Sequence, residues 1–479
     1  MKNSRLEHDM LGEREVPADR YYGIQTLRAI ENFDITGIPI SHYPRLIRSL
    51  AYIKKAAALT NSELGLLDHR LADAIARACD QLLAGNLLEE FVVDVIQGGA
   101  GTSVNMNANE VIANRALELL GYERGRYEIL HPLNHVNMSQ STNDVYPTAL
   151  RLTLSQKLDG LMVEMAHLRD ALARKADEFA DVIKMGRTQL QDAVPMTLGQ
   201  EFGAWAIMVT EDIQRVKEAQ SLIREVNMGA TAIGTGLNAH PDYTPQVIER
   251  LRTLTGIPIV GSENLVEATQ DAGAYVQLSG VLKRVATKLS KICNDLRLLS
   301  SGPRAGLHEI NLPAMAPGST IMPGKVNPII PEVVNQVAFE VIGNDITVTL
   351  AAEAGQLELN VMEPVIAYNL FTSIDMLGRA CRTLADRCVA GITANRDECR
   401  RMVEHSIGLV TALNPYIGYE ASSQLAEEAL KSGRSVYEIV LEKGYLSKAE
   451  LDDILSPENM TKPRHTLKDR GETPVSKRE

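Results

Sequence analysis

Residues 278–299, LSGVLKRVATKLSKICNDLRLL, place an apolar side chain at alternating steps of four and three residues. Residues 154–172 repeat this spacing, and residues 202–216 follow it less regularly. A repeat near 3.5 residues puts the apolar side chains on one face of a long helix, as in the packing seam of a helix bundle. The two regular seams consist of Leu154, Leu158, Leu161, Met165, Leu168 and Leu172, and of Leu278, Leu282, Val285, Leu289, Ile292, Leu296 and Leu299. Both seams are longer than a typical globular helix of about a dozen residues, so the sequence predicts a mainly α protein built on an extended bundle.

One further stretch predicts that the bundle is part of an assembly. Residues 333–351, VVNQVAFEVIGNDITVTLA, are apolar on more than one side of a helix. A helix that is apolar all round is buried rather than exposed on a monomer surface. We therefore expect an oligomeric helix bundle.

Composition narrows the class of protein. The chain has 479 residues, a net charge of -12 and a pI near 5.5. Its length predicts several domains, and its acidity disfavours nucleic-acid binding, which needs a basic face. Five cysteines without a C-x-x-C pair indicate reduced, buried thiols. The charged N-terminus lacks an apolar segment, and no apolar run is long enough to span a membrane, so we expect a cytoplasmic protein with no membrane partner.

Polar segments rich in glycine or proline interrupt the helical pattern. They contain many Ser, Thr, Asn and Gln side chains, and most adjoin a long predicted helix. Hydroxyls and amides at helix N-termini orient carboxylate oxygens, and a lysine adds a point charge. One such residue alone would be read as a helix cap, but the set predicts a small anionic substrate. The segments are 98–109, 131–148, 184–200, 229–238 and 301–331.

Several familiar motifs are absent. Lys325 follows a glycine, yet Val326 stands where a P-loop needs Ser or Thr, and the glycine spacing is one residue too long. Gly99 and Gly101 lack the third glycine of a dinucleotide fingerprint, and no G-x-S-x-G hydrolase motif occurs.

Two weaker possibilities come from the histidines and the C-terminal region. His131 and His135 have the spacing of zinc ligands, but Pro132 lies between them and no H-E-x-x-H motif or cysteine partner accompanies them. We prefer a structural or site-lining role and expect no metal ligand. Two short helices predicted near the C-terminus could suggest helix-turn-helix DNA binding, but the second of them carries Asp452 and Asp453 where a basic helix is needed.

Residues 318–328, GSTIMPGKVNP, resemble the signature loop of the aspartase/fumarase superfamily. The likeness extends from about residue 8 to about residue 460 and includes Thr320, where the family usually has a second serine. Five other segments carry it: GGAGTSVNMNANEV, HVNMSQSTND, KMGRTQLQDAVPMTLGQE, GATAIGTGLN and LLSSGPRAGLHEINLP.

The resemblance implies a three-domain fold. Residues 1–140 would form a mixed, mostly helical N-terminal domain, and residues 141–395 a central domain of five long helices. Residues 396–479 would form a small helical C-terminal domain, with a loose tail from Pro457 onward. Four chains would associate into a homotetramer with a twenty-helix core, and each active site would take segments from three chains.

The resemblance also implies the reaction, the elimination of ammonia from L-aspartate to give fumarate. Thr142 and Gln189 favour the aspartase branch, because class II fumarases typically have Ser and His at these positions. A class II fumarase is the alternative, followed by a non-catalytic structural relative such as the lens proteins of the superfamily. No cofactor would be required, although a divalent cation such as Mg²⁺ can activate some aspartases.

Roles for individual residues follow from the same resemblance. Ser319 would be the general base on a mobile loop, with Gly318 and Gly324 as its hinges. An aci-carboxylate intermediate in an anti elimination would need the most stabilisation. The residues around the β-carboxylate would be Thr102, Ser141, Thr142 and Thr320; those holding the α-carboxylate, Lys325 and Asn327; and those lining the amino-group pocket, Asn143, Thr188 and Gln189.

Overall fold

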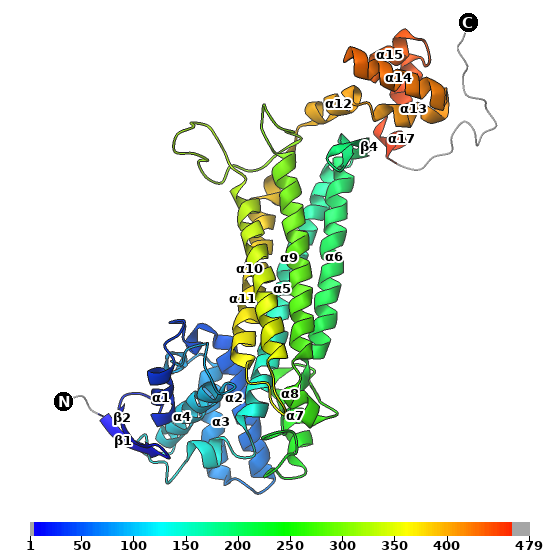
Figure 1. Cartoon of the computed structure of the whole chain (residues 1–479). Coiled ribbons are helices and arrows are strands. Elements are labelled where there is room, and N and C mark those ends of the chain that lie inside the picture. The colour runs from blue at the N-terminus through cyan, green and yellow to red at the C-terminus, as the bar shows by residue number, and fades with distance from the viewer. Residues whose placement is uncertain (1–3, 462–479) are drawn as a thin grey trace. The chain divides into compact units, whose positions relative to one another are not determined.

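The computed structural model describes residues 4–461 (Figure 1). The chain divides into two compact units. Unit 1 contains the described residues up to Val163 together with Gln214–Ala286 and Phe339–Gly378. Unit 2 contains Glu164–Ile213, Thr287–Ala338 and the described residues from Arg379 onward. The predicted boundaries of the three domains stay a prediction.

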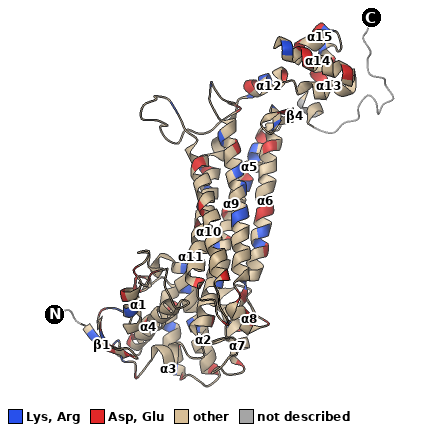
Figure 2. Ribbon diagram, viewed as in Figure 1, with Lys and Arg blue, Asp and Glu red and all other residues tan. Residues whose placement is uncertain are grey.

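Five long helices confirm the mainly α fold within the described part of the chain, and the unit boundaries fall inside them. Every residue of the two regular seams is buried, with an exposed fraction of at most 5%. Figure 2 shows acidic and basic residues interspersed along these helices. The helices are α5 Thr142–Glu178, α6 Leu198–Ile223, α9 Gly273–Leu299, α10 Ile329–Glu353 and α11 Glu363–Arg387.

Polar contacts between neighbouring long helices fix their register in each unit. In unit 1, Lys157 Nζ on α5 lies 2.6 Å from Asp375 Oδ1 on α11. In unit 2, Asn335 Nδ2 on α10 donates to Ser290 Oγ on α9 at 2.8 Å. Because buried polar groups need specific partners, such pairs select one alignment of otherwise similar apolar faces.

The rest of unit 1 packs short helices against the beginning of α5. Figure 1 shows α1 to α4 gathered beside the N-terminal hairpin. The hairpin pairs β1 Ser4–Asp9 with β2 Gly12–Pro17, and a parallel pair joins β5 Glu225–Val226 to β6 Val260–Gly261. The helical elements are α1 Ile24–Asn32, η1 Ile40–His42, α2 Pro44–Glu63, α3 His69–Leu83, η2 Leu88–Glu90, α4 Thr102–Leu119, the π-helical turn η3 Pro132–Val136, α7 Tyr243–Thr255 and α8 Leu265–Gln270.

Unit 2 adds a hairpin and a C-terminal helical cluster. The hairpin pairs β3 Ile183–Thr188 with β4 Gln191–Thr197, and β7 Ile310–Asn311 pairs with β8 Thr393–Ala394. The remaining helices are η4 Val389–Gly391, α12 Arg396–His405, α13 Leu409–Ile417, α14 Tyr419–Ser432, α15 Val436–Glu442, α16 Lys448–Ile454 and α17 Pro457–Met460.

The C-terminal predictions are confirmed in part. Helices α15 and α16 occupy the two stretches predicted as short helices, and Ser447 and Glu450 form a capping box at the start of α16. The expectation of a loose tail from Pro457 onward is wrong for its first residues. They form α17, and Met460 packs against the apolar cluster of α13 to α16. The rest of the predicted tail, 462–479, lies outside the described residues.

Two composition-based predictions can also be compared with the structure. All five cysteines are free and buried, as expected. Within residues 4–461, no helix combines the length and apolar character needed to cross a membrane.

Candidate active site

In unit 1, the N-termini of two helices lie side by side. Helix α4 begins at Thr102 and α5 begins at Thr142. Asn105 Nδ2, one turn into α4, donates a hydrogen bond of 3.0 Å to Thr142 Oγ1. Unpaired N–H groups and the partial positive charge of each helix end favour an anion at such a place. The structure therefore brings Thr102 and Thr142 to neighbouring helix ends, the kind of place that favours an anion.

The sequence Ser141-Thr142-Asn143-Asp144 starts α5 by a reciprocal cap. Ser141 Oγ accepts from the N–H of Asn143 at 3.2 Å, and Asp144 Oδ1 accepts from the N–H of Ser141 at 3.0 Å. The arrangement resembles a capping box with aspartate at N3, except that the Ser141 hydroxyl bonds the N–H of N2 rather than that of N3. It orients the polar side chains of the first turn and explains why a helix of 37 residues begins here.

Asp144 also attaches a second segment to this helix start. Its other oxygen, Oδ2, accepts from the N–H groups of Gly229 at 3.2 Å and Thr231 at 3.0 Å. Asn143 Nδ2 donates to the carbonyl of Ala232 at 2.7 Å. Asp144 is fully buried, and burial raises the pKa of its carboxyl to about 7. The predicted amino-group ligand Asn143 is thus held between α5 and the glycine-rich segment 229–234.

A glycine positions the start of α4. Gly101 precedes Thr102 with a φ of 88°, in the left-handed region that favours glycine. A Cβ at this position would lie 2.4 Å from the ring of Tyr146 on α5. The missing side chain therefore lets the two helix ends approach each other. Thr102 is exposed, and its Oγ1 donates to the carbonyl of Gly99 at 2.7 Å.

Beneath these helix ends lies a buried lysine. Lys54 on α2 is 0% exposed, and its Nζ donates to Asn137 Oδ1 at 2.9 Å and to Gln140 Oε1 at 2.8 Å. Burial lowers the pKa of its ammonium to about 7. The loop that leads into Ser141 is therefore held from below by a titratable cation.

In unit 2, the predicted residues Thr188 and Gln189 lie at the tip of the β3–β4 hairpin. Thr188 pairs with Gln191, so Gln189 and Leu190 form a two-residue turn, with φ values of 54° and 62°. Such a turn normally contains Asn or Gly, and side chains larger than these are strained there. The hairpin is anchored close to its tip through Arg187, which precedes Thr188 and pairs with the buried carboxylate of Glu309.

The loop 317–328 in unit 2 carries the remaining predicted residues. Ser319 Oγ accepts from the N–H groups of Ile321 at 3.2 Å and Met322 at 3.0 Å. Asn327 Nδ2 donates to the carbonyl of Gly318 at 2.6 Å, and the N–H of Gly318 donates to the carbonyl of Lys325 at 2.8 Å. Thr320 and Lys325 are exposed. Two N–H donors on one hydroxyl oxygen would favour its deprotonated form.

Glycine is favoured at two positions of this loop for two different structural reasons. Gly324 has a φ of 83°. Gly318 is needed for close approach, because a Cβ there would lie 2.3 Å from the carbonyl oxygen of Lys325. The hinge role of both glycines stays a prediction.

The predicted residues thus form one group in unit 1 and two separate sets in unit 2. Unit 1 brings together Thr102, Ser141, Thr142 and Asn143. Unit 2 carries Thr188 and Gln189 on the hairpin and the remaining residues on the loop 317–328. Within the described chain, no hydrogen bond or ion pair joins the hairpin residues to the loop residues.

The sequence patterns alone did not identify Asp144 and Lys54 as candidate site residues. The Ser-x-x-Asp spacing was the available signal for Asp144. For Lys54, the signal was its place on the apolar face of α2, at helical spacing from Ile47 and Leu50.

The histidine pair has a structural role in the fold. His135 Nδ1 accepts from the N–H of His131 at 2.8 Å, and His131 Nδ1 accepts from the N–H of Leu133 at 3.0 Å. Burial lowers the pKa of both imidazoles. Across residues 4–461, no three His, Cys, Asp or Glu side chains are grouped so as to hold a metal ion.

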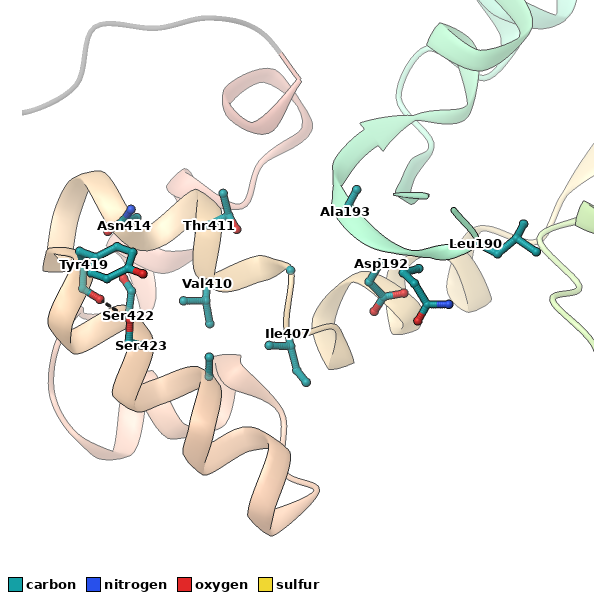
Figure 3. A pocket seen from close by; sticks show the side chains of 13 residues that line it. Leu190, Asp192, Ala193, Ile407, Val410, Thr411, Asn414, Tyr419, Ser422 and Ser423 are labelled. Carbon is teal, nitrogen blue, oxygen red and sulfur yellow. Dashed lines mark hydrogen bonds between the residues drawn. The ribbon is translucent and has the colours of Figure 1, made fainter. Parts of the chain in front are cut away.

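A separate cavity of about 800 Å³ lies between the β3–β4 hairpin and helices α13 and α14 (Figure 3). Asp192 faces it and accepts a hydrogen bond of 2.6 Å from Ser406 Oγ. The described lining residues include no Lys or Arg. A cavity with a carboxylate and no cation suits a dicarboxylate substrate poorly, so the helix ends of unit 1 remain the better candidate.

Comparison of the chain with known proteins identifies its family. A family described as lyase matches residues 12–343, and the fumarase C C-terminal family matches residues 409–462. The chain therefore belongs to the lyase family of the aspartase/fumarase superfamily.

Individual relatives give more detail. Aspartate ammonia-lyase of Helicobacter pylori strain J99 is 62% identical over 97% of this chain and 99% of its own length. A fumarate lyase:delta crystallin from Brucella melitensis, solved bound to cobalt, superposes with a TM-score of 0.94 at 56% identity, covering 96% of this chain and 100% of its own. A class II fumarase from Schistosoma mansoni gives a TM-score of 0.92 at 38% identity, covering 97% and 100%.

The contact between Gly101 and Tyr146 yields a prediction. Gly101→Ala should destabilise the protein by several kcal/mol, since it combines a left-handed backbone with an overlap in a packed interior. Displacement of Thr102 should also weaken substrate binding. Gly99→Ala is the control, because Gly99 has a φ of 94° but its Cβ would lie 3.7 Å from the nearest atom, on Thr102. Thermal melts should show a clearly larger loss for Gly101→Ala, and equal losses would contradict the proposed packing.

Proposed function

We propose that the protein catalyses the reversible elimination of ammonia from L-aspartate to give fumarate. Its aspartate ammonia-lyase relative is 62% identical, whereas the class II fumarase is 38% identical. The observation that carries the proposal is the junction of the α4 and α5 N-termini, where Asn105 bonds Thr142. An electropositive helix junction lined by hydroxyls suits a carboxylate that gains charge during reaction.

The β-carboxylate of the substrate would bind at this junction. Removal of a Cβ proton moves an electron pair toward that carboxylate and creates the aci-carboxylate with one additional negative charge. Thr102, Ser141 and Thr142, with Thr320 from the loop, would donate hydrogen bonds to it. Losing one such donor typically slows an enzyme by roughly 10²–10³-fold.

Ser319 would take the proton from Cβ. Its oxygen already receives two backbone N–H groups, and Lys325 would add positive charge when the loop closes over the substrate. Lys325 and Asn327 would hold the α-carboxylate, while Asn143, Thr188 and Gln189 would surround the amino group. Return of the electron pair from the aci-carboxylate then forms the double bond as the C–N bond breaks on the opposite face and ammonia departs.

The proposed active unit is a homotetramer in which each site takes segments from three chains. Helix α10 carries an apolar stripe at heptad-like spacing, formed by Phe339, Gly343, Ile346 and Leu350. Phe339, Ile346 and Leu350 are 63%, 60% and 62% exposed in the isolated chain. Side chains of this kind on a bundle helix need a partner surface, and copies of the same chain would supply it.

We also propose a cytoplasmic enzyme with a small-molecule substrate, without nucleic-acid or membrane partners, that requires no cofactor. A divalent cation such as Mg²⁺ would act as an activator only. Its removal with EDTA would then lower the rate without abolishing the reaction.

The function is tested by following fumarate absorbance after adding the purified protein to L-aspartate, D-aspartate or L-malate. We expect fumarate and equimolar ammonia from L-aspartate alone. Formation of fumarate from L-malate instead would identify a class II fumarase, and inactivity toward every substrate would favour the non-catalytic alternative.

Ser319→Ala tests the proposed base. It should leave the assembly intact and reduce turnover by at least about 10³-fold, because the remaining donors cannot take a proton. Sedimentation of the variant controls for assembly. Turnover above a few per cent of wild type would exclude Ser319 as the base.

Ile346→Glu tests the assembly. A charge within the apolar stripe should dissociate the tetramer and remove activity, because sites shared between chains are lost with the interface. Leu430→Glu is the matched control, since Leu430 is similarly exposed, at 67%, but belongs to a different helix, α14. Analytical ultracentrifugation should show smaller species for Ile346→Glu only. An intact tetramer with that substitution would contradict the assignment of this face.

A further inference from the structure

Lys54 is a buried cation for which the proposed chemistry has no role so far. Its ammonium donates to two amide oxygens, those of Asn137 and Gln140. No carboxylate lies within ion-pair distance of its Nζ among the residues that the structure describes. A fully buried charge without an ionic partner is costly, and its presence beside a binding site calls for an explanation.

Hydrogen bonds connect this ammonium to the predicted carboxylate ligands. Asn137 Oδ1, which accepts from Lys54, also accepts from Asn105 Nδ2 at 3.2 Å. Asn105 donates in turn to Thr142 Oγ1 at 3.0 Å. Gln140, the second acceptor, directly precedes Ser141. Hydrogen bonds through Asn137 and Asn105 therefore link Lys54 to the junction of α4 and α5.

The charged groups around Lys54 are few. Asp144 on α5 favours the ammonium electrostatically, and Cys79 on α3 is close enough to interact with it electrostatically. Tyr243 on α7 faces Asp144, and burial raises the pKa of the Cys79 thiol and the Tyr243 phenol well above their ordinary values. Lys54 and Asp144 are thus the groups in this set that change charge near neutral pH.

We propose that Lys54 is a positioning residue whose ammonium form holds Asn137 and Gln140 in place and adds positive charge beneath the dicarboxylate site, so that binding of a dicarboxylate draws a proton onto Lys54. The inference rests on the proposed function. The proton comes from solvent, and no covalent bond changes in the protein. Each negative charge that arrives at the helix junction favours the charged form of the lysine.

The consequence is a defined pH dependence. The pKa of Lys54 is about 7 in the free protein. Near pH 8 the side chain is therefore mostly neutral before binding and becomes charged on binding. Near pH 6 it is already charged, so little uptake remains. By linkage, dicarboxylate affinity falls as pH rises through the free-protein pKa and continues to fall until the pKa of the complex is reached.

The experiment is calorimetric titration of the full-length assembly with succinate, a dicarboxylate without an amino group to eliminate. Titrations at pH 8 in phosphate and in Tris, which differ in ionisation enthalpy, give the number of protons taken up. We expect an uptake approaching one proton per site in wild type at pH 8 and a much smaller uptake at pH 6. Lys54→Met keeps the aliphatic stem, so it should abolish most of the uptake and weaken binding at pH 6 by about tenfold or more.

Lys55→Met is the matched control. Lys55 is the next residue on α2, and its Nζ lies 2.5 Å from Asp80 Oδ1 on α3. Its loss should leave proton uptake and affinity unchanged. Lys54→Arg keeps a charge at every pH, so if it folds it should bind succinate without uptake.

Several results would overturn the proposal. Uptake that persists in Lys54→Met would assign the proton to Asp144 instead. Wild-type binding without uptake at pH 8 would refute the role of Lys54 even if the variants fail to fold, which circular dichroism would reveal. Failure of wild type to bind succinate at any pH, together with inactivity on L-aspartate, would overturn the proposed dicarboxylate site itself.

Discussion

The buried carboxylate of Asp144 is the contact on which the candidate site of unit 1 depends. Its two oxygens accept three backbone N–H groups, those of Ser141, Gly229 and Thr231. An N–H left without an acceptor inside a protein costs roughly 1–3 kcal/mol. One side chain therefore fixes where α5 begins and where the segment 229–231 lies against it. The positions of Ser141, Thr142 and Asn143 follow from this arrangement.

The long helices explain why the site is built at helix ends. Their regular seams bury whole faces along α5 and α9, which makes these helices rigid supports. Polar residues at the helix ends can then be positioned by caps rather than by mobile loops. The exposed apolar stripe of α10 uses the same heptad-like spacing. In the proposed assembly, the pattern that forms the bundle within one chain would therefore also join chains, and activity would depend on the same structural element.

The sequence predicted much of the fold because its signals are local. The spacing of Leu278 to Leu299 predicts a long helix by itself, and the capping residue Ser447 marks a short one. The resemblance of residues 318–328 to a family signature loop predicted the family, and the comparisons with known proteins confirmed it. Lys54 was missed because periodicity assigns it to an apolar face without showing what would satisfy its charge.

The contacts that the sequence could not predict join residues distant along the chain. Asn105 and Thr142 are 37 positions apart, and Asp144 and Thr231 are 87 apart. No local pattern links such pairs, since they meet only after α2, α4 and α5 have packed. The overlap of a Gly101 side chain with Tyr146 is of the same kind. A glycine in a turn is expected for many reasons, and only the packed structure shows which one applies.

The central claim is that two helix N-termini form the carboxylate site. Its most direct test is a crystal structure of the Ser319→Ala variant with L-aspartate. The account predicts one substrate carboxylate within hydrogen-bond distance of Thr102, Ser141 and Thr142. L-aspartate bound instead in the cavity beside Asp192, with no ligand at the junction of α4 and α5, would contradict it.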